Sequence, residues 1–188
     1  VLRHTGAGIG TFVPADTIPI GAGAEPVDMA VADYDGQDED DVAVITRDDG
    51  FVRVYLNDGS AGFSAGDSQF VADLPGAIVA GDWDADAAVD LAVSDAENDE
   101  VDVLRNDGTG AFTETDTIAL ADGADPFALA AGLMDGDAAE DLVVADAGTG
   151  EVSVVLSAGD GTFATRTDYV AGYWPGSVTV GDFDADGS

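Results

Sequence analysis

A unit of about 50 residues recurs along this chain. Pro26, Pro75, Pro126 and Pro175 each stand seven residues before the start of an acidic loop, and successive prolines are 49, 51 and 49 residues apart. A fixed period of this length is typical of repeat proteins, in which each unit buries its apolar face against the next. We expect the 188 residues to form one domain, with partial repeats at 1–25 and 175–188 and complete repeats at 26–74, 75–125 and 126–174.

Within a repeat, the residue pattern is that of short β-strands. In the first complete repeat, Met29–Ala32 and Val42–Ile45 are apolar runs on either side of the acidic loop, and Val52–Leu56 alternates with period two. Asn57-Asp58-Gly59 then supplies tight-turn residues before a fourth strand and its exit at 63–74. Four short strands per repeat predict an all-β fold, a β-propeller of four-stranded antiparallel blades. A parallel β-helix is the weaker alternative, because its rungs are much shorter.

The two ends of the chain each supply part of a further blade. Val1–His4 matches a third strand, Thr11–Val13 a fourth strand and Val178–Val180 a first strand, which gives three complete blades and a split fourth. We expect the chain to be a fragment of a longer propeller, and the alternative is that its ends meet in one composite blade. The incomplete blade is also a candidate surface for self-association.

The acidic loops carry the candidate chemistry. They begin at residues 33, 82, 133 and 182, and aspartate fills 13 of the 15 available places at loop positions one, three, five and nine, although chance would fill only two or three. Ca²⁺ takes about six to eight oxygen ligands, and carboxylates at alternate positions of a tight loop point into one cavity. Mg²⁺ fits less well because it keeps more of its waters, and a solvated acidic turn is the simplest alternative. The predicted Ca²⁺ ligands are Asp33, Asp35, Gln37, Asp41, Asp82, Asp84, Asp86, Asp90, Asp135, Asp137, Asp141, Asp182, Asp184 and Asp186.

Some loop positions depart from this pattern. Gln37 offers an amide oxygen in place of a carboxylate, and Ala85 and Ala87 stand where glycine is usual. Leu133 replaces the first ligand of the third loop, so we expect that site to be weak or empty, and the fourth loop lacks its ninth residue. An apolar residue recurs at loop position two, where we expect packing between blades: Tyr34, Trp83, Met134 and Phe183.

These loops and the strands around them resemble the FG-GAP/VCBS repeats of integrin-α-like propellers. The resemblance covers the whole chain and is close at 178–187, which reads Val-Thr-Val-Gly-Asp-Phe-Asp-Ala-Asp-Gly, and at 157–163, which reads Ser-Ala-Gly-Asp-Gly-Thr-Phe. It implies a propeller that holds Ca²⁺ in the loop between the first and second strands of a blade. Members of this family are mostly extracellular and serve in adhesion or ligand binding, or as accessory modules of secreted enzymes.

The charge balance is extreme and argues against several partners. Thirty-nine acidic residues face five arginines and no lysine, for a formal net charge of -34, yet 46% of the residues are hydrophobic. This is the composition of a folded domain with an acidic surface, not of a disordered tail. We expect no nucleic-acid partner, because the charge repels phosphate, and no membrane insertion, because no apolar run approaches ~20 residues. The acid excess resembles that of salt-in halophiles, with acidic solubility of a secreted protein as the alternative.

Three classes of function compete. The leading hypothesis is a Ca²⁺-binding extracellular or cell-surface propeller that acts in adhesion or binds a protein or carbohydrate ligand. The second is a non-catalytic propeller module of a larger secreted enzyme or surface protein. The third is a propeller enzyme such as a polysaccharide lyase. The sequence disfavours an enzyme, because the repeats account for most aspartates and His4 is the sole histidine, so no catalytic residues are predicted.

We expect any ligand to bind on the face opposite the acidic loops. In a blade, the loops after the first and third strands emerge on one face, and the remaining connections emerge on the other. Variable loops on a rigid scaffold usually carry recognition. The candidate ligand contacts in those connections are Arg47, Tyr173 and Trp174.

Overall fold

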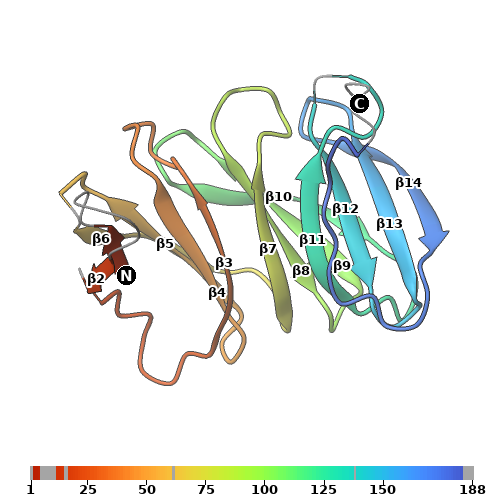
Figure 1. Ribbon diagram of the computed structural model, residues 1–188, viewed down its shortest axis with the longest axis horizontal. Coiled ribbons are helices and arrows are strands. Elements are labelled where there is room, and N and C mark those ends of the chain that lie inside the picture. The colour runs from red at the N-terminus through yellow and green to blue at the C-terminus, as the bar shows by residue number, and fades with distance from the viewer. Residues whose placement is uncertain (1, 5–11, 15–16, 61, 138, 184–188) are drawn as a thin grey trace.

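The computed structural model describes residues 2–4, 12–14, 17–60, 62–137 and 139–183 (Figure 1). The described residues form three four-stranded antiparallel sheets and one two-stranded sheet, without a helix. In each large sheet the strands lie in sequence order, which confirms the predicted propeller blades. Blade 1 comprises β3 (Pro26–Ala32), β4 (Asp41–Thr46), β5 (Phe51–Asn57) and β6 (Phe63–Phe70); blade 2 comprises β7 (Pro75–Gly81), β8 (Asp90–Asp95), β9 (Glu100–Asn106) and β10 (Phe112–Ala119); blade 3 comprises β11 (Pro126–Gly132), β12 (Asp141–Asp146), β13 (Glu151–Ser157) and β14 (Phe163–Val170).

The second strand of each blade is the most deeply buried. All six residues of β8 and all six of β12 are buried, whereas β14 on the outside is almost wholly exposed. A strand that is covered on both faces needs apolar side chains on both, so these segments are apolar runs and not alternating ones. Within β8, Leu91 and Val93 face blade 1, and Ala92 between them faces blade 3.

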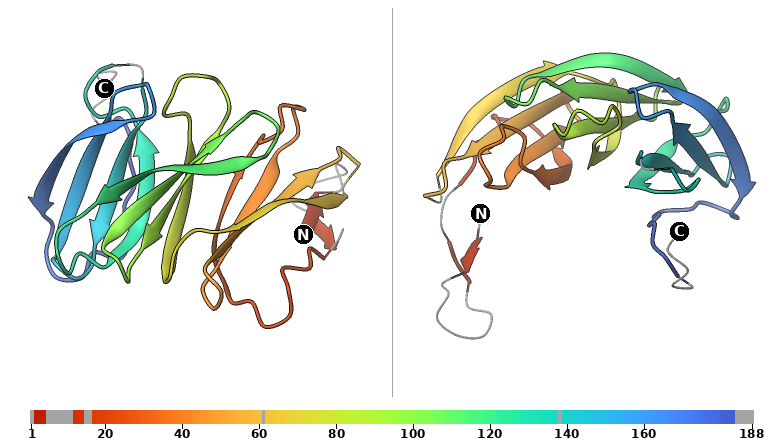
Figure 2. Two further views of the ribbon diagram at one scale, coloured as in Figure 1. Left: turned by 180° about the vertical axis from the view of Figure 1, so that it is seen from behind. Right: turned by 90° about the horizontal axis from the view of Figure 1, so that it is seen from above.

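The three blades follow one another along an open arc (Figure 2). The first strands β3, β7 and β11 lie next to one another on the inner side of the arc. The last strands β6, β10 and β14 form its outer rim. The loops that leave the ends of the strands are therefore presented at two opposite edges of the arc.

Each hydrophobic core fills a seam between two blades. The apolar residues at loop position two close these seams, because Tyr34 packs edge-on against Phe112 of the next blade with ring centroids 5.6 Å apart, and Trp83 lies 6.1 Å from Phe163. Tyr34 and Trp83 are fully buried, which confirms the predicted packing between blades. Met134, at the same position in blade 3, is 43% exposed, because within the described residues no further blade covers that side.

The fourth strand of blade 1 ends at Phe70, and its exit follows over 71–74, within the span predicted for strand and exit together. The strand stops at Phe70 because the amides of Val71 and Ala72 turn away from the ladder and donate to the Gly50 carbonyl at 2.9 and 3.3 Å. Residues 71–74 form the connection to blade 2.

The described residues near the two ends of the chain share no sheet. Near the N-terminus, β1 (Leu2–His4) and β2 (Phe12–Pro14) pair antiparallel with each other, as expected for third and fourth strands. The predicted first strand at 178–180 is wrong for this structure, since residues 175–183 form no strand. A first strand pairs with the second strand of its own blade, and no described strand pairs with this segment. Val180 instead packs against β11, where its Cγ1 lies 2.5 Å from the place a Cβ would take at Gly132.

Candidate metal centre

The acidic loops emerge at one edge of the arc, each between the first and second strands of its blade. Ala32 faces Asp41 across the first pair of strands, and Gly81 faces Asp90 across the equivalent pair in blade 2. The turns between third and fourth strands reach the same edge, since Asn106 Nδ2 donates to the Tyr34 carbonyl at 2.8 Å. The predicted division of the loops between two faces therefore holds for blades 1 and 2.

In the first loop, three carboxylates converge. Asp33, Asp35 and Asp41 each offer an oxygen, and these oxygens lie within 4.8 Å of one another. Asp33 also shapes the loop, because its carboxylate accepts hydrogen bonds from the amides of Gly36 and Asp38 at 2.8 and 2.9 Å. These contacts hold the loop in a tight turn around the cluster.

Two further predicted ligands of this loop differ in their surroundings. Asp41 is fully buried, and its two oxygens accept hydrogen bonds from the amides of Tyr34 and Asn57 at 2.9 and 2.7 Å. The Gln37 side chain is exposed and donates from Nε2 to Asp35 Oδ2 at 2.7 Å. As it stands, Gln37 presents its amide nitrogen to the cluster, so ligation by its oxygen requires the amide to turn over.

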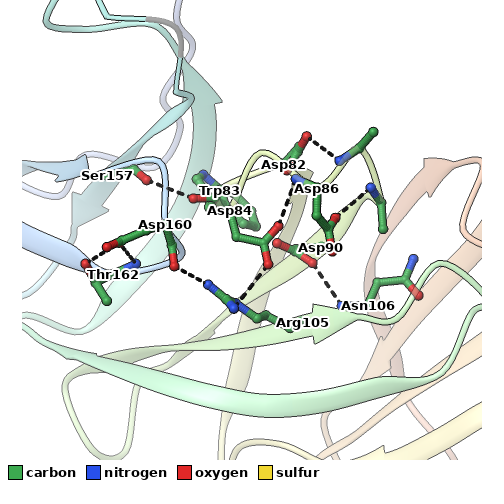
Figure 3. A network of polar contacts seen from close by, with 12 residues as sticks. Asp82, Trp83, Asp84, Asp86, Asp90, Arg105, Asn106, Ser157, Asp160 and Thr162 are labelled. Carbon is green, nitrogen blue, oxygen red and sulfur yellow. Dashed lines mark hydrogen bonds and ion pairs between the residues drawn. The ribbon is translucent and has the colours of Figure 1, made fainter.

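The second loop gathers four carboxylates (Figure 3). Oxygens of Asp82, Asp84 and Asp86 lie within 4.8 Å of one another, and Asp90 lies beside them. Ala85 and Ala87 both adopt left-handed backbone angles, with φ of 58° and 71°. Such angles are unfavourable for alanine and easy for glycine, which has no Cβ. The second loop adopts these unfavourable angles at Ala85 and Ala87, and its carboxylates still converge.

Asp90 is the most perturbed carboxyl of this loop. It is 1% exposed, and its Oδ1 accepts a hydrogen bond from the Asn106 amide at 2.9 Å. Its Oδ2 and the Oδ1 of Asp82 are buried and receive no hydrogen bond from the described residues. Burial, together with the nearby charges of Asp84 and Asp86, raises the pKa of Asp90 to about 6. Two buried oxygens without donors, in a group of like charges, are the arrangement that a bound cation would satisfy.

The third and fourth loops are less complete. Asp135 and Asp137 are exposed, Asp141 is fully buried, and within the described residues these three do not converge as the first two sets do. Leu133, at the first ligand position, is 51% exposed. Asp182 belongs to the described part of the fourth loop, whereas Asp184 and Asp186 lie outside the described residues.

One arginine ties the second loop to blade 3 (Figure 3). Arg105 Nη1 lies 3.2 Å from Asp84 Oδ2, and its Nη2 donates to the carbonyl of Asp160 in the neighbouring blade. A side chain at Gly161 would overlap this guanidinium, so the glycine is needed to admit it. The Trp83 carbonyl accepts a second link from blade 3, a 2.9 Å hydrogen bond from the Gly161 amide. The second acidic loop and the seam between blades 2 and 3 are therefore linked by direct contacts.

A family model of FG-GAP-like repeats matches residues 82–144 and 134–188, which together make up more than half of the chain. The chain belongs to the FG-GAP-like repeat family. The match includes the second, third and fourth acidic loops. No curated protein matches this FG-GAP-like chain.

Two solved structures show the same fold at low sequence identity. A protein from Lactobacillus plantarum aligns with 77% of this FG-GAP-like chain at a TM-score of 0.57 and 14% identity. BBS1N, crystallised in complex with ARL6DN, aligns with 83% of it at a TM-score of 0.55 and 16% identity. The FG-GAP-like chain spans 41% and 47% of those two chains, less than half of each.

The predicted ligand contacts lie at the edge opposite the acidic loops but do not form one site. Arg47 is exposed in blade 1, while Tyr173 and Trp174 follow blade 3, with blade 2 between them. Tyr173 is 95% exposed and Trp174 63% exposed, and their rings are tilted by 31° with centroids 6.4 Å apart. They border a shallow pocket of about 220 Å³ that is lined on its other side by residues 147–150.

Two features of this FG-GAP-like chain escaped the sequence analysis. One is the role of Arg105 between two blades. The other is a cluster of Asp95, Glu100 and Asp102 in blade 2, at the edge opposite the acidic loops, whose oxygens lie within 4.8 Å of one another. Burial and the nearby charges of Glu100, Glu114 and Asp95 raise the pKa of Asp102 to about 7. Glu100 and Asp102 are two residues apart, which puts both side chains on one face of a strand, and this spacing could have indicated the cluster.

Proposed function

We propose that this chain is an extracellular β-propeller that Ca²⁺ stabilises through its first two acidic loops and that acts in adhesion or binds a protein or carbohydrate ligand. The observation that carries the Ca²⁺ proposal is a pair of buried oxygens without donors, one on Asp82 in the group of three converging carboxylates and one on Asp90 beside that group. Hard oxygen ligands from one short loop suit Ca²⁺ better than a softer metal. The residues that would hold the ion are those of the predicted set in these loops: Asp33, Asp35, Gln37, Asp41, Asp82, Asp84, Asp86 and Asp90.

The role of Ca²⁺ follows from the position of the loops. When bound, the ion supplies positive charge that offsets the repulsion among carboxylates. The second loop also carries Trp83, which closes the seam to blade 3, and Asp84, which holds Arg105. Fixing this loop therefore fixes the packing of one blade against the next, so the ion acts in folding and not in a reaction.

Thermal melts test this role at constant, high NaCl. A ligand that binds only the folded state at a hundredfold excess over its Kd adds about 2.7 kcal/mol, so millimolar Ca²⁺ should raise the Tm by roughly 5–10 °C over EDTA. Asp86→Asn, an exposed change in the second loop, should reduce this increment, and Asp122→Asn, an exposed acid outside the loops, should preserve it. Coincident melts of the parent chain with Ca²⁺ and EDTA would refute the proposal.

Ligand recognition is proposed for the edge opposite the acidic loops. Tyr173 and Trp174 offer two exposed aromatic faces beside a pocket, and exposed aromatic surface of this kind marks binding sites. After a glycan-array or protein-interaction screen has found a ligand, Trp174→Ala should weaken binding and leave the Ca²⁺-dependent melt unchanged. Tyr169→Ala, an exposed aromatic on the outer strand, is the matched control. Loss of binding only after changes in the acidic loops of a folded protein would contradict this placement. Arg47→Ala tests the separate position in blade 1.

A second candidate is a propeller module within a larger secreted or surface protein. The chain spans less than half of each similar structure, and this partial coverage is the observation that supports the second candidate. No helix among the described residues is long and apolar enough to cross a membrane. Sequencing the complete gene distinguishes the two candidates.

A further inference from the structure

Among the ion pairs of the described residues, the one formed by Arg105 reaches an acidic loop (Figure 3). Its Nη1 lies 3.2 Å from Asp84 Oδ2, and its Nη2 donates to the Asp160 carbonyl in blade 3. The side chain of Asp84 is 11% exposed and that of Arg105 33%, so water and salt screen this pair only in part. Asp84 is also a predicted Ca²⁺ ligand, so the arginine and an ion would share one carboxylate.

The position of Arg105 is fixed by the strand that carries it. Arg105 and Asn106 are consecutive residues at the end of β9, so their side chains point to opposite faces of the blade. Asn106 Nδ2 donates to the Tyr34 carbonyl in blade 1, and the Asn106 amide donates to Asp90 Oδ1 at 2.9 Å. The end of β9 therefore contacts the second loop at two of its predicted ligands, Asp84 and Asp90.

Blade 1 has an apolar side chain where blade 2 has this cation. Leu56 stands 49 residues before Arg105, at the matching position of the repeat. A Cβ placed on Gly110 would lie 3.0 Å from Leu56 Cδ2 and 3.8 Å from Asp35 Cβ. The guanidinium of Arg105 stands in the same relation to Gly161, where it would overlap an added Cβ. The two seams are thus built alike, and only the side chain beside the loop differs.

The arginine accompanies the loop with the most ligand carboxylates. Loop positions one, three, five and nine hold three carboxylates in the first loop, four in the second and three in the third. At position five, Asp86 of the second loop replaces Gln37 of the first. The residues that match Arg105 are Leu56 in blade 1 and Leu156 in blade 3. With the guanidinium included, the second loop carries a formal charge of -3 at these positions, the same as the other two loops.

We propose that Arg105 is a built-in counterion of the second acidic loop, which offsets its fourth carboxylate and competes with Ca²⁺ for Asp84. This inference rests on the proposed function, in which Ca²⁺ binds that loop. A positive charge held beside a cation site lowers the affinity for a second cation, and an oxygen engaged by a guanidinium is a poorer ligand. Because the same guanidinium holds the Asp160 carbonyl, ion binding at this loop is coupled to the contact between blades 2 and 3.

The test is a Ca²⁺ titration of the full chain followed by amide NMR at one fixed NaCl concentration. The amides of Ala87 and Ala88 donate to carboxylates of the second loop and report on it. Those of Gly36 and Asp38 donate to a carboxylate of the first loop and provide an internal control. If neither pair shifts in the parent chain, the proposed function fails and this inference fails with it.

Three variants then isolate the charge of Arg105. Arg105→Leu introduces the residue of the matching positions and should lower the Ca²⁺ concentration needed by the second loop by about tenfold, with the first loop unchanged. Arg105→Lys keeps the charge and should bind as the parent does. Arg166→Leu is the matched control, because it removes an equal charge and a hydrogen bond to the Ala119 carbonyl of blade 2 without touching an acidic loop.

The direction of the change separates this role from a purely structural one. If Arg105 only tied the blades together, Arg105→Leu would loosen the second loop and weaken its Ca²⁺ binding. Unchanged or weaker binding in Arg105→Leu, with both loops shifting in the parent, overturns the inference and leaves the proposed function standing. If Arg105→Leu does not fold, Leu56→Arg serves instead, since it moves the cation to the first loop and should weaken Ca²⁺ binding there by about tenfold. Parent-like affinity of the first loop in Leu56→Arg would also overturn the inference.

Discussion

At the scale of single residues, stability depends on which side chains a neighbouring blade covers. Trp83 and Met134 occupy the same loop position, yet Trp83 is fully buried against Phe163 and Met134 is 43% exposed. Removing a buried aromatic loses its contacts and leaves a cavity, whereas trimming an exposed side chain loses little. The residue at this loop position therefore contributes much more to the free energy of unfolding in blade 2 than in blade 3.

This contrast gives a paired prediction. Trp83→Ala should lower the free energy of unfolding by about 3–5 kcal/mol, and Met134→Ala by less than about 1 kcal/mol. Denaturant unfolding at fixed NaCl and Ca²⁺ measures both. Similar losses for the two variants would mean that Met134 is covered in solution, by a second copy or another partner.

A second residue-scale prediction concerns Asp146, at the end of β12. Burial raises its pKa to about 6, its Oδ1 has no donor among the described residues, and Ser153 donates to its Oδ2 at 2.6 Å. Because the folded-state pKa lies above the unfolded value, this group favours the folded state below about pH 4, and the contribution is lost as pH rises through about 6.

Asp146→Asn should remove that pH dependence. The variant should be more stable than the parent at pH 7 by on the order of 1–3 kcal/mol and should gain nothing near pH 4. Denaturant midpoints measured from pH 4 to 7 in parallel for both proteins provide the comparison. A constant difference between them across this range would show that Asp146 does not titrate there.

At the scale of elements, the turns between third and fourth strands lock one blade to the next. Asn106 is 3% exposed, and its Nδ2 donates to the Tyr34 carbonyl of blade 1 at 2.8 Å. In blade 3, Ser157 Oγ donates to the Trp83 carbonyl at 3.2 Å in the same way. Asn57, at the matching position in blade 1, donates from Nδ2 to the Asp40 carbonyl of its own blade at 3.0 Å and to no other blade among the described residues.

Asn106→Ala should therefore destabilise the fold more than Asn57→Ala. The first change leaves buried carbonyls without a donor and should cost about 1–3 kcal/mol, whereas the second leaves a carbonyl that water can reach and should cost under about 1 kcal/mol. Urea unfolding of the two variants, under the same Ca²⁺ and salt conditions, gives the difference. An equal cost would place the stabilising role of this asparagine within the turn and not between blades.

At the scale of the whole molecule, self-repulsion is the dominant electrostatic term. The net charge of -34 is spread over 188 residues, and the described structure contains only three ion pairs. Salt reduces the Debye length from about 10 Å at 0.1 M to about 3 Å at 1 M, which screens repulsion between neighbouring surface charges. Salt should therefore favour the compact state.

The corresponding prediction is a rise in Tm between 0.1 and 2 M NaCl with Ca²⁺ saturating throughout. KCl at the same ionic strength should give a similar rise, because screening depends on ionic strength more than on the identity of the cation. Thermal melts followed by circular dichroism measure the effect. A Tm that stays flat across this range would contradict adaptation to high salt and favour acidic solubility as the reason for the composition.

The sequence alone determined the blades and the acidic loops, because both depend on local spacing. Period-two and apolar runs between Pro26 and Phe70 specify strands, and aspartates at alternate loop positions such as Asp82 and Asp84 converge within a few residues. The predicted first strand at 178–180 is wrong, because no described strand pairs with that segment.

Only the tertiary structure decided what each residue meets across a seam or a strand pair. It buried Trp83 and left Met134 exposed, although both occupy the same loop position. It also gave Arg105 partners in two blades and brought the carboxylates of Asp95, Glu100 and Asp102 together. These outcomes depend on the register of the strands and on which blade lies next to which. Neither is set by neighbouring residues in the sequence, because both arise from burying apolar surface between units about 50 residues apart.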